Sequence, residues 1–176
     1  LVVPLWLLGR WRAESPVVRA AVGVVVLLPT WAALLYLHGR GPSVLLGVMA
    51  IVWIADTAAY FSGRQFGRHK LAPAISPGKT WEGVAGGLTG SAVFSVFAGQ
   101  WFGWNGDRLI AFVALALVCA AISIVGDLFF SLLKRQQNLK DTGHLFPGHG
   151  GILDRVDALM FVSAWFLAYA TWIRGA

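Results

Sequence analysis

Carboxylates are the residues most able to do chemistry in this sequence, because they are few and the chain around them is apolar. There are 8 Asp and Glu among 176 residues, and Asp56 and Asp127 fall inside apolar runs. A carboxylate at mid-membrane costs about 2.5–3.5 kcal/mol on insertion scales, and less toward the interface. Such a cost suggests use in a site. The alternative is that a nearby Lys or Arg neutralises each acid, which then only anchors a helix end.

A polar stripe leads from Asp127 out of its apolar run. Its members are Ser123, Asp127, Ser131, Lys134 and Arg135. Their spacing is i, i+4, i+8, i+11 and i+12, which puts them on one face if a helix continues past Asp127. The pattern therefore predicts a carboxylate, hydroxyls and two cations in one row.

A second pair of acids follows the stripe. Asp154 and Asp157 are three residues apart, so a helix that begins near Leu153 would present both on one side. Paired carboxylates beside Lys and Arg suit a site for Mg²⁺ and phosphate, because hard oxygen ligands hold the ion and the cations bind the remaining phosphate charge. For Lys134, Arg135 and Lys140 alone, the alternative is a solvated basic edge facing lipid head groups.

Between these acids lies a glycine-rich segment, Phe146-Pro147-Gly148-His149-Gly150-Gly151. Its glycines permit positive φ and a close approach of the backbone to a ligand. His149 could assist proton transfer or bind phosphate, although a lone histidine is more often structural. No cluster of Cys and His has the spacing of a zinc site.

A third candidate is the segment Ser76 to Glu82, in which Gly78-Lys79-Thr80 resembles the end of a phosphate-binding loop. The phosphate-binding loop motif needs a Gly five residues before Gly78, where this chain has Pro73. The motif also follows a β-strand, and we do not expect a strand at this place in the chain. Lys79 and Thr80 can still hold phosphate by ordinary charge and hydroxyl contacts.

Apolar runs of span length must position these residues. The apolar residue types make up 57% of the chain and the charged types 12%, about half the usual charged share of roughly 25%, which excludes a soluble or disordered chain. A span needs about 20 residues, and the runs show no strand alternation. We predict an all-α polytopic membrane bundle, one transmembrane domain over 1–176, with about five spans. The runs are 17–37, 44–62, 83–103, 109–130 and 156–173.

The basic residues set the expected orientation. Five spans would place 11 of the 14 Lys and Arg on one side, which the positive-inside rule makes cytoplasmic. The segments 63–82 and 131–155, which carry the candidate site, then share the cytoplasmic face. The net charge of +6 indicates attraction to anionic lipid rather than nucleic-acid binding. The chain starts at Leu1 within an apolar stretch, so we expect it to be the C-terminal part of a longer protein.

The run from Ser131 to Asp157 closely resembles the signature of the phosphatidate cytidylyltransferases, also called CDP-diacylglycerol synthases. That signature is S-x-x-K-R-x4-K-D-x-G-x3-P-G-H-G-G-x-L-D-R-x-D, and every fixed position is present. Three shorter stretches are similar to the family as well: 56–64, 76–83 and 126–128. The similarity spans about 50–174 and is weakest at Gly78, while the N-terminal helices of the family have no counterpart.

This resemblance implies a membrane enzyme that joins CTP to phosphatidic acid, releasing pyrophosphate and giving CDP-diacylglycerol. It implies Mg²⁺ held by Asp127 and Asp154, with Asp141 and Asp157 as supporting ligands and a second cation left open. Phosphate groups would face Lys134, Arg135, Lys140 and His149. Further substrate contacts would come from Asp56, Ser76, Lys79, Thr80, Glu82, Ser131, Gly150, Gly151 and Arg155. The partners implied are both substrates and membrane lipid, with a homodimer left open, in a bacterial-type inner membrane.

Three other classes stay open. An ion or proton transporter would also place acids in helices, but it gives no reason for the run from Lys134 to Asp157. A membrane scaffold explains the apolar helices but not the acids within them. A CTP-dependent lipid kinase is the nearest competitor, since it would release CDP instead of pyrophosphate. The motif D-G-x2-A-R of the CDP-alcohol phosphotransferases is absent.

Overall fold

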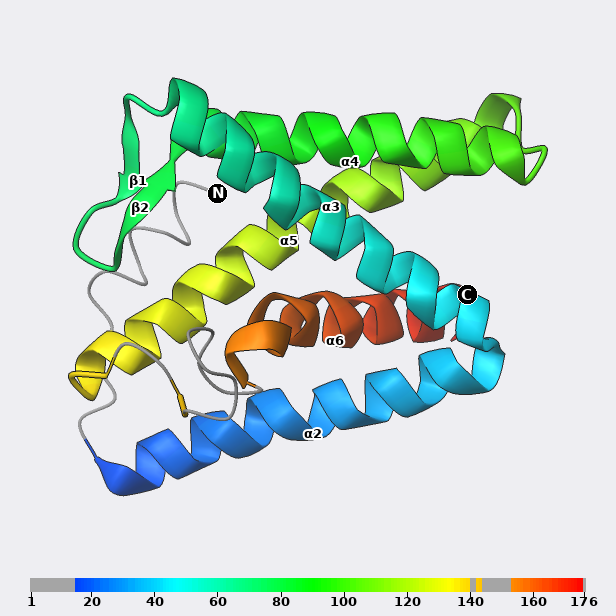
Figure 1. The fold of residues 1–176 in the computed structure, drawn as a ribbon. Coiled ribbons are helices and arrows are strands. Elements are labelled where there is room, and N and C mark those ends of the chain that lie inside the picture. The colour runs from blue at the N-terminus through cyan, green and yellow to red at the C-terminus, as the bar shows by residue number, and fades with distance from the viewer. Residues whose placement is uncertain (1–14, 140–141, 144–152, 176) are drawn as a thin grey trace. The chain divides into compact units, whose positions relative to one another are not determined.

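Helices dominate the computed structural model, which describes residues 15–139, 142–143 and 153–175 (Figure 1). Each predicted apolar run coincides with one helix, except that the run 83–103 extends two residues past the end of its helix at Trp101, so the prediction of an all-helical membrane fold is confirmed. The elements are α2 (Pro16–Arg40), α3 (Pro42–Phe66), β1 (Lys70–Ala72), β2 (Ser76–Thr80), α4 (Trp81–Trp101), α5 (Gly106–Gln136) and α6 (Leu153–Gly175).

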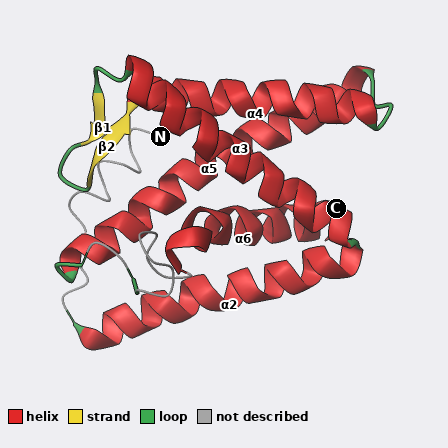
Figure 2. Cartoon of the chain, viewed as in Figure 1, coloured by secondary structure: helices red, strands yellow, loops and turns green. Residues whose placement is uncertain are grey.

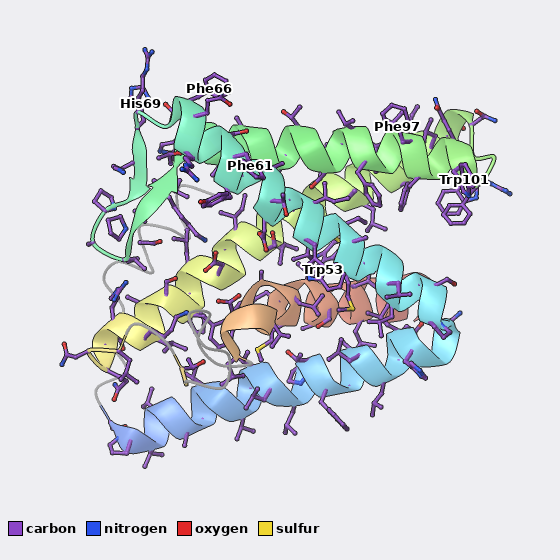
Figure 3. All side chains as sticks on the ribbon, viewed as in Figure 1. Trp53, Phe61, Phe66, His69, Phe97 and Trp101 are labelled. Carbon is purple, nitrogen blue, oxygen red and sulfur yellow. The ribbon has the colours of Figure 1, made fainter. Side chains whose placement is uncertain are left out.

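Three helices, α2, α3 and α5, are long and apolar enough to cross a membrane. Exposed aromatic side chains such as Trp53, Phe61 and Phe97 project from α3 and α4 (Figure 3), as expected for surfaces in contact with lipid. The chain is therefore an integral membrane protein. In the described part of α6 the apolar stretch is shorter, Val156–Ala168, and spans by α4 and α6 stay predictions.

The chain forms two compact units. The first is built from the described parts of Leu1–Leu45 and Val125–Ala176, and the second is Leu46–Ile124. The first unit contains α2, α6 and the C-terminal end of α5. The second contains most of α3, the two strands, α4 and the first part of α5.

In the first unit α2 packs against α6. Ser15 caps α2 by accepting a hydrogen bond from the backbone N–H of Val18 at 3.1 Å, and Pro29 lies inside the helix. The buried hydroxyl of Thr30 donates to the carbonyl oxygens of Val26 at 2.7 Å and Met160 at 3.3 Å. The second of these bonds ties the two helices together in their buried core.

The end of α5 also packs against α6. A Cβ atom on Gly126 would lie 2.9 Å from the Cβ of Phe161, so the backbone of α5 rests directly on that ring. The rings of Phe129 and Phe130 meet Phe161 edge to face, with centroids 5.3 and 6.2 Å apart. This contact fixes the part of α5 that carries Asp127 beside the start of α6.

In the second unit α3 and α4 approach closely through small residues. A Cβ on Gly87 would lie 2.9 Å from the carbonyl oxygen of Ala55, and one on Gly90 would lie 2.6 Å from the Cβ of Ala58. Small residues at such spacing let helix backbones pack tightly in membranes. Figure 2 shows the strands at the end of α3 and α4 where the two helices are joined.

The segment between α3 and α4 contains a β-hairpin, where the sequence pattern indicated no strand. Strands β1 and β2 are antiparallel, with Lys70 opposite Thr80 and Ala72 opposite Ser76. The expectation that no strand precedes Gly78 was therefore wrong, because strands of 3 and 5 residues are too short to show periodicity. Gly78, Lys79 and Thr80 lie within β2 itself, so they do not form a phosphate-binding loop.

Candidate active site

The polar stripe on α5 is one continuous helical row, because α5 extends to Gln136. The prediction that a helix continues past Asp127 is therefore confirmed. The Ser131 hydroxyl donates to Oδ1 of the half-buried Asp127 at 3.4 Å. Ser123 is fully buried and donates to the carbonyl oxygen of Ala120 at 2.8 Å. Asp127 and Ser131 therefore belong to the candidate site, whereas Ser123 is satisfied within its own helix.

An ion pair joins the stripe to α6. Nζ of Lys134 lies 3.8 Å from Oδ2 of Asp157, and these side chains are only 15% and 13% exposed. The other oxygen of Asp157, Oδ1, accepts from the backbone N–H of Ala158 at 2.8 Å. Two charges so shielded from water interact strongly, and loss of one would leave the other poorly solvated. The structure thus brings together two of the predicted site residues, 23 positions apart in sequence.

Helix α6 begins at Leu153, as predicted, so Asp154 and Asp157 lie three residues apart on a helix. The side chains of Asp154 and Arg155 are outside the described set. Five further predicted site residues also lie outside the described residues: Lys140, Asp141, His149, Gly150 and Gly151. Arg135 is described and exposed in the last turn of α5.

The donor atoms suit a hard cation. Within the described side chains no group of three or more His, Cys, Asp or Glu could hold a metal ion. The described acids of the first unit, Asp127 and Asp157, nevertheless offer carboxylate oxygens that are shielded from bulk water. Mg²⁺ prefers such oxygen ligands and usually keeps waters or substrate phosphates as its other ligands. Two carboxylates with a supporting hydroxyl are therefore a donor set that fits Mg²⁺.

In the second unit, Thr80 has a capping role. Its side chain is buried and its hydroxyl accepts from the backbone N–H of Gly83 at 3.1 Å, which caps α4. Glycines surround it closely: a Cβ on Gly63 would lie 3.0 Å from the Thr80 hydroxyl, and one on Gly67 would lie 2.8 Å from its methyl carbon. Thr80 thus holds the end of β2 against α3 and α4.

Glu82 is bound by a histidine that the sequence did not single out. Its two carboxylate oxygens accept from the backbone N–H of His69 at 3.3 and 3.2 Å, and Oε1 lies 2.6 Å from Nδ1 of that ring. The His69 side chain's hydrogen bond is the main cause that lowers the pKa of Glu82 to about 2. An ionised carboxylate only accepts hydrogen bonds, so Nδ1 of His69 carries the proton.

The remaining predicted residues of this unit lie on β2 and α3. Ser76 and Lys79 are half-buried in β2, and Asp56 is exposed on α3. One and two turns after Asp56 come Tyr60 and Arg64, and Nη1 of Arg64 donates to the Tyr60 hydroxyl at 3.3 Å. The i, i+4, i+8 spacing of these three could have been read from the sequence as a polar row on α3.

Comparison with known proteins gives the family. A model of the Cytidylyltransferase family matches residues 8–173, and the chain belongs to this family. Similar curated proteins are named phosphatidate cytidylyltransferase. That of Pseudomonas aeruginosa is 45% identical over 153 residues, covering 86% of this chain and 54% of the relative. That of Haemophilus influenzae is 43% identical over 163 residues, covering 86% and 56%.

A third relative of the same name, from Brucella melitensis, is 43% identical over 171 residues, covering 93% of this chain and 58% of the relative. The chain thus spans about half the length of the curated relatives that it matches. The matched half contains the complete signature from Ser131 to Asp157.

Proposed function

We propose that the protein containing this chain transfers the cytidylyl group of CTP to phosphatidic acid, giving CDP-diacylglycerol and pyrophosphate. The observation that carries this proposal is the meeting of α5 and α6, where Lys134 pairs with Asp157 at 3.8 Å beside the Asp127–Ser131 row. The names of the relatives support it. A transporter or a scaffold gives no reason for shielded cations and carboxylates in this signature.

The reaction joins two anions. A phosphate oxygen of the lipid attacks the α-phosphorus of CTP, a new P–O bond forms, and the bond from that phosphorus to the bridging oxygen breaks as pyrophosphate leaves. A phosphate monoester is already ionised near neutral pH, so no residue has to remove a proton. What the chain must supply is positive charge that offsets the repulsion and stabilises the leaving group.

On α5, Lys134 and Arg135 would supply that charge, with Lys140 and His149 adding further phosphate contacts. Arg155, Gly150 and Gly151 would complete the phosphate side of the site. Lys134 is oriented by Asp157, so its ammonium group is held in place before substrate arrives, and preorganised charge costs little to reorganise in the reaction.

Asp127 and Asp154 would hold Mg²⁺, with Asp141 and Asp157 as supporting ligands. When bound, the ion supplies further neutralisation of phosphate charge. Ser131 would orient Asp127 through its 3.4 Å hydrogen bond. By resemblance to the family, Asp56, Ser76 and Lys79 would add contacts to substrate. A second cation is left to the test.

The setting proposed is the cytoplasmic face of a bacterial inner membrane, from the charge distribution along the chain. Phosphatidic acid would enter from the surrounding leaflet. The protein could act as a homodimer, but the proposed function does not depend on this.

The test is the nucleotide product. The full-length protein, in detergent micelles with phosphatidic acid, CTP and Mg²⁺, should release pyrophosphate and form a lipid that retains the cytidine label. Omission of Mg²⁺ should abolish both. Release of CDP with phosphate on the lipid would instead identify a lipid kinase, and no Mg²⁺-dependent CTP binding at all would contradict both enzymes.

A further inference from the structure

A closed set of hydrogen bonds joins the end of the hairpin to the first turn of α4. The backbone N–H and Nδ1 of His69 donate to the Glu82 carboxylate, with 2.6 Å between Nδ1 and Oε1. In return, the backbone N–H of Trp81 donates to the carbonyl oxygen of His69 at 3.0 Å. We call His69 and Glu82, with these bonds, the hairpin clamp.

The clamp lies directly beside the strand that carries Lys79. Lys70, next to His69, pairs with Thr80, which follows Lys79 and caps α4. Figure 3 shows His69 where the chain passes from α3 into β1. The clamp and the Thr80 cap both act on the residues directly after Lys79, and the pairing of β2 with β1 holds the strand itself, so that the backbone of Lys79 has little freedom to turn.

Glu82 has no need of the clamp for helix stability alone. A carboxylate in the first turn of a helix already interacts favourably with the helix dipole, and Thr80 already caps the helix. Instead the carboxylate is turned back to the hairpin, and its side chain is 24% exposed while that of His69 is 78% exposed. The arrangement serves to hold the hairpin in one position, not to bury apolar surface.

We propose that His69 and Glu82 are positioning residues, which hold Lys79 on β2 where it contacts a substrate phosphate. This rests on the proposed function. It also changes the role expected for Glu82, whose carboxylate acts through His69 and the hairpin rather than on the substrate.

The experiment uses the full-length protein and three variants. His69→Ala should raise the KM for CTP or for phosphatidic acid about tenfold, the change expected from loss of one charge-assisted hydrogen bond, with kcat within about twofold. His69→Asn should restore the wild-type KM, because its side-chain N–H can donate in place of Nδ1. His38→Ala, at an exposed histidine in the last turn of α2, is the matched control and should change nothing.

A double-mutant cycle with Lys79→Gln separates positioning from general structure. If His69 acts through Lys79, removing His69 from a protein that already lacks Lys79 should cause no further rise in KM. Additive effects, a wild-type KM in His69→Ala, or a failure of His69→Asn to restore KM would each overturn the proposal.

Hydrogen exchange gives a readout that does not depend on activity. His69→Ala should speed exchange of the backbone N–H groups of residues 69 and 81, and His69→Asn should not. Unchanged hydrogen exchange at residues 69 and 81 in His69→Ala would contradict the clamp, irrespective of the variant's activity. If the wild-type protein shows slow hydrogen exchange at residues 69 and 81 but releases no pyrophosphate, the proposed function is contradicted while the hydrogen bonds of the clamp are supported. If His69→Ala does not fold, Glu82→Gln provides the same comparisons.

Discussion

The α5–α6 site and the hairpin clamp use the same kinds of side chain in different ways. Between α5 and α6, Lys134 and Asp157 meet at 3.8 Å with both side chains largely shielded, and Asp127 accepts a hydrogen bond from the Ser131 hydroxyl at 3.4 Å. In the clamp, bonds of 2.6–3.3 Å engage both oxygens of Glu82. The first arrangement pairs opposite charges on two helices, whereas the second uses its charge to hold the backbone of the hairpin against the first turn of α4.

The role of a carboxylate in this chain therefore depends on the donors that bind it. From the sequence, the resemblance to the family implies that Asp127 binds the metal ion and that Glu82 contacts substrate. Only the structure shows that backbone and imidazole donors of His69 bind the Glu82 carboxylate, whereas Asp127 lies beside Ser131 on the helix that meets α6.

The largest expected effect is at Asp127. Asp127→Asn keeps the shape but removes the charge, and we expect kcat to fall by about 10²- to 10³-fold, as for other preorganised electrostatic groups. Asp107→Asn, an exposed acid in the first turn of the same helix, is the control and should keep full turnover. Equal activity of both variants in pyrophosphate release would remove the distinction between the two kinds of carboxylate.

The next effect is at the ion pair. Lys134→Gln removes a proposed phosphate contact and the ion pair with Asp157, so kcat/KM should fall about 10- to 100-fold, which corresponds to about 1.4–2.8 kcal/mol for a lost charged interaction. Arg108→Gln, at an exposed residue of α5, should leave kcat/KM unchanged. If Lys134→Gln only lowered the melting temperature and kept kcat/KM, the pair would be structural, like the clamp.

A smaller effect concerns the contact that sets α5 against α6. Gly126→Ala would place a methyl group 2.9 Å from Phe161, and such overpacking destabilises by about 1–3 kcal/mol. Phe161→Leu in the same protein should recover part of the loss. Gly23→Ala, where nothing lies within 4 Å, should be neutral or stabilising because Ala is the better helix former. Thermal unfolding in detergent measures all three, and an unchanged melting temperature in Gly126→Ala would contradict this packing.

The smallest effect is the pH dependence of the clamp. The pKa of Glu82 falls from 4.5 to about 2 in the folded chain, so its ionised form stabilises the fold above pH 4.5, and this contribution is lost as the pH falls toward 2. The difference in melting temperature between wild type and Glu82→Gln should thus be constant from pH 8 to 5 and shrink below about pH 4.5. If the difference in melting temperature between wild type and Glu82→Gln grew as the pH fell below 4.5, this would contradict a lowered pKa of Glu82 in the folded chain.

The helices and the polar row on α5 could be predicted because both depend on local pattern. Apolar runs of span length predict helices, and spacing of three and four residues predicts a shared face, which α5 shows for Asp127, Ser131 and Lys134. The start of α6 at Leu153 followed from the same reasoning about Asp154 and Asp157.

The clamp and the hairpin could not be predicted, because they depend on contacts across the chain. His69 and Glu82 are 13 residues apart, and no helical or strand period connects them. Strand β1 has 3 residues, too few for alternation to appear. The direct contact of Gly126 with Phe161 likewise depends on how two helices meet, which the apolar pattern of each helix leaves open.

The most direct test of the central claim is whether Asp127 and the first-turn acid of α6 serve one cation. Mg²⁺-dependent binding of CTP should be measured by calorimetry in full-length wild type, Asp127→Asn, Asp154→Asn and the double variant. Each single change should remove the Mg²⁺-dependent part of the affinity for CTP, and the double variant should bind CTP no more weakly than either single variant. Additive losses, or Mg²⁺ dependence that survives in Asp127→Asn, would contradict a shared ion.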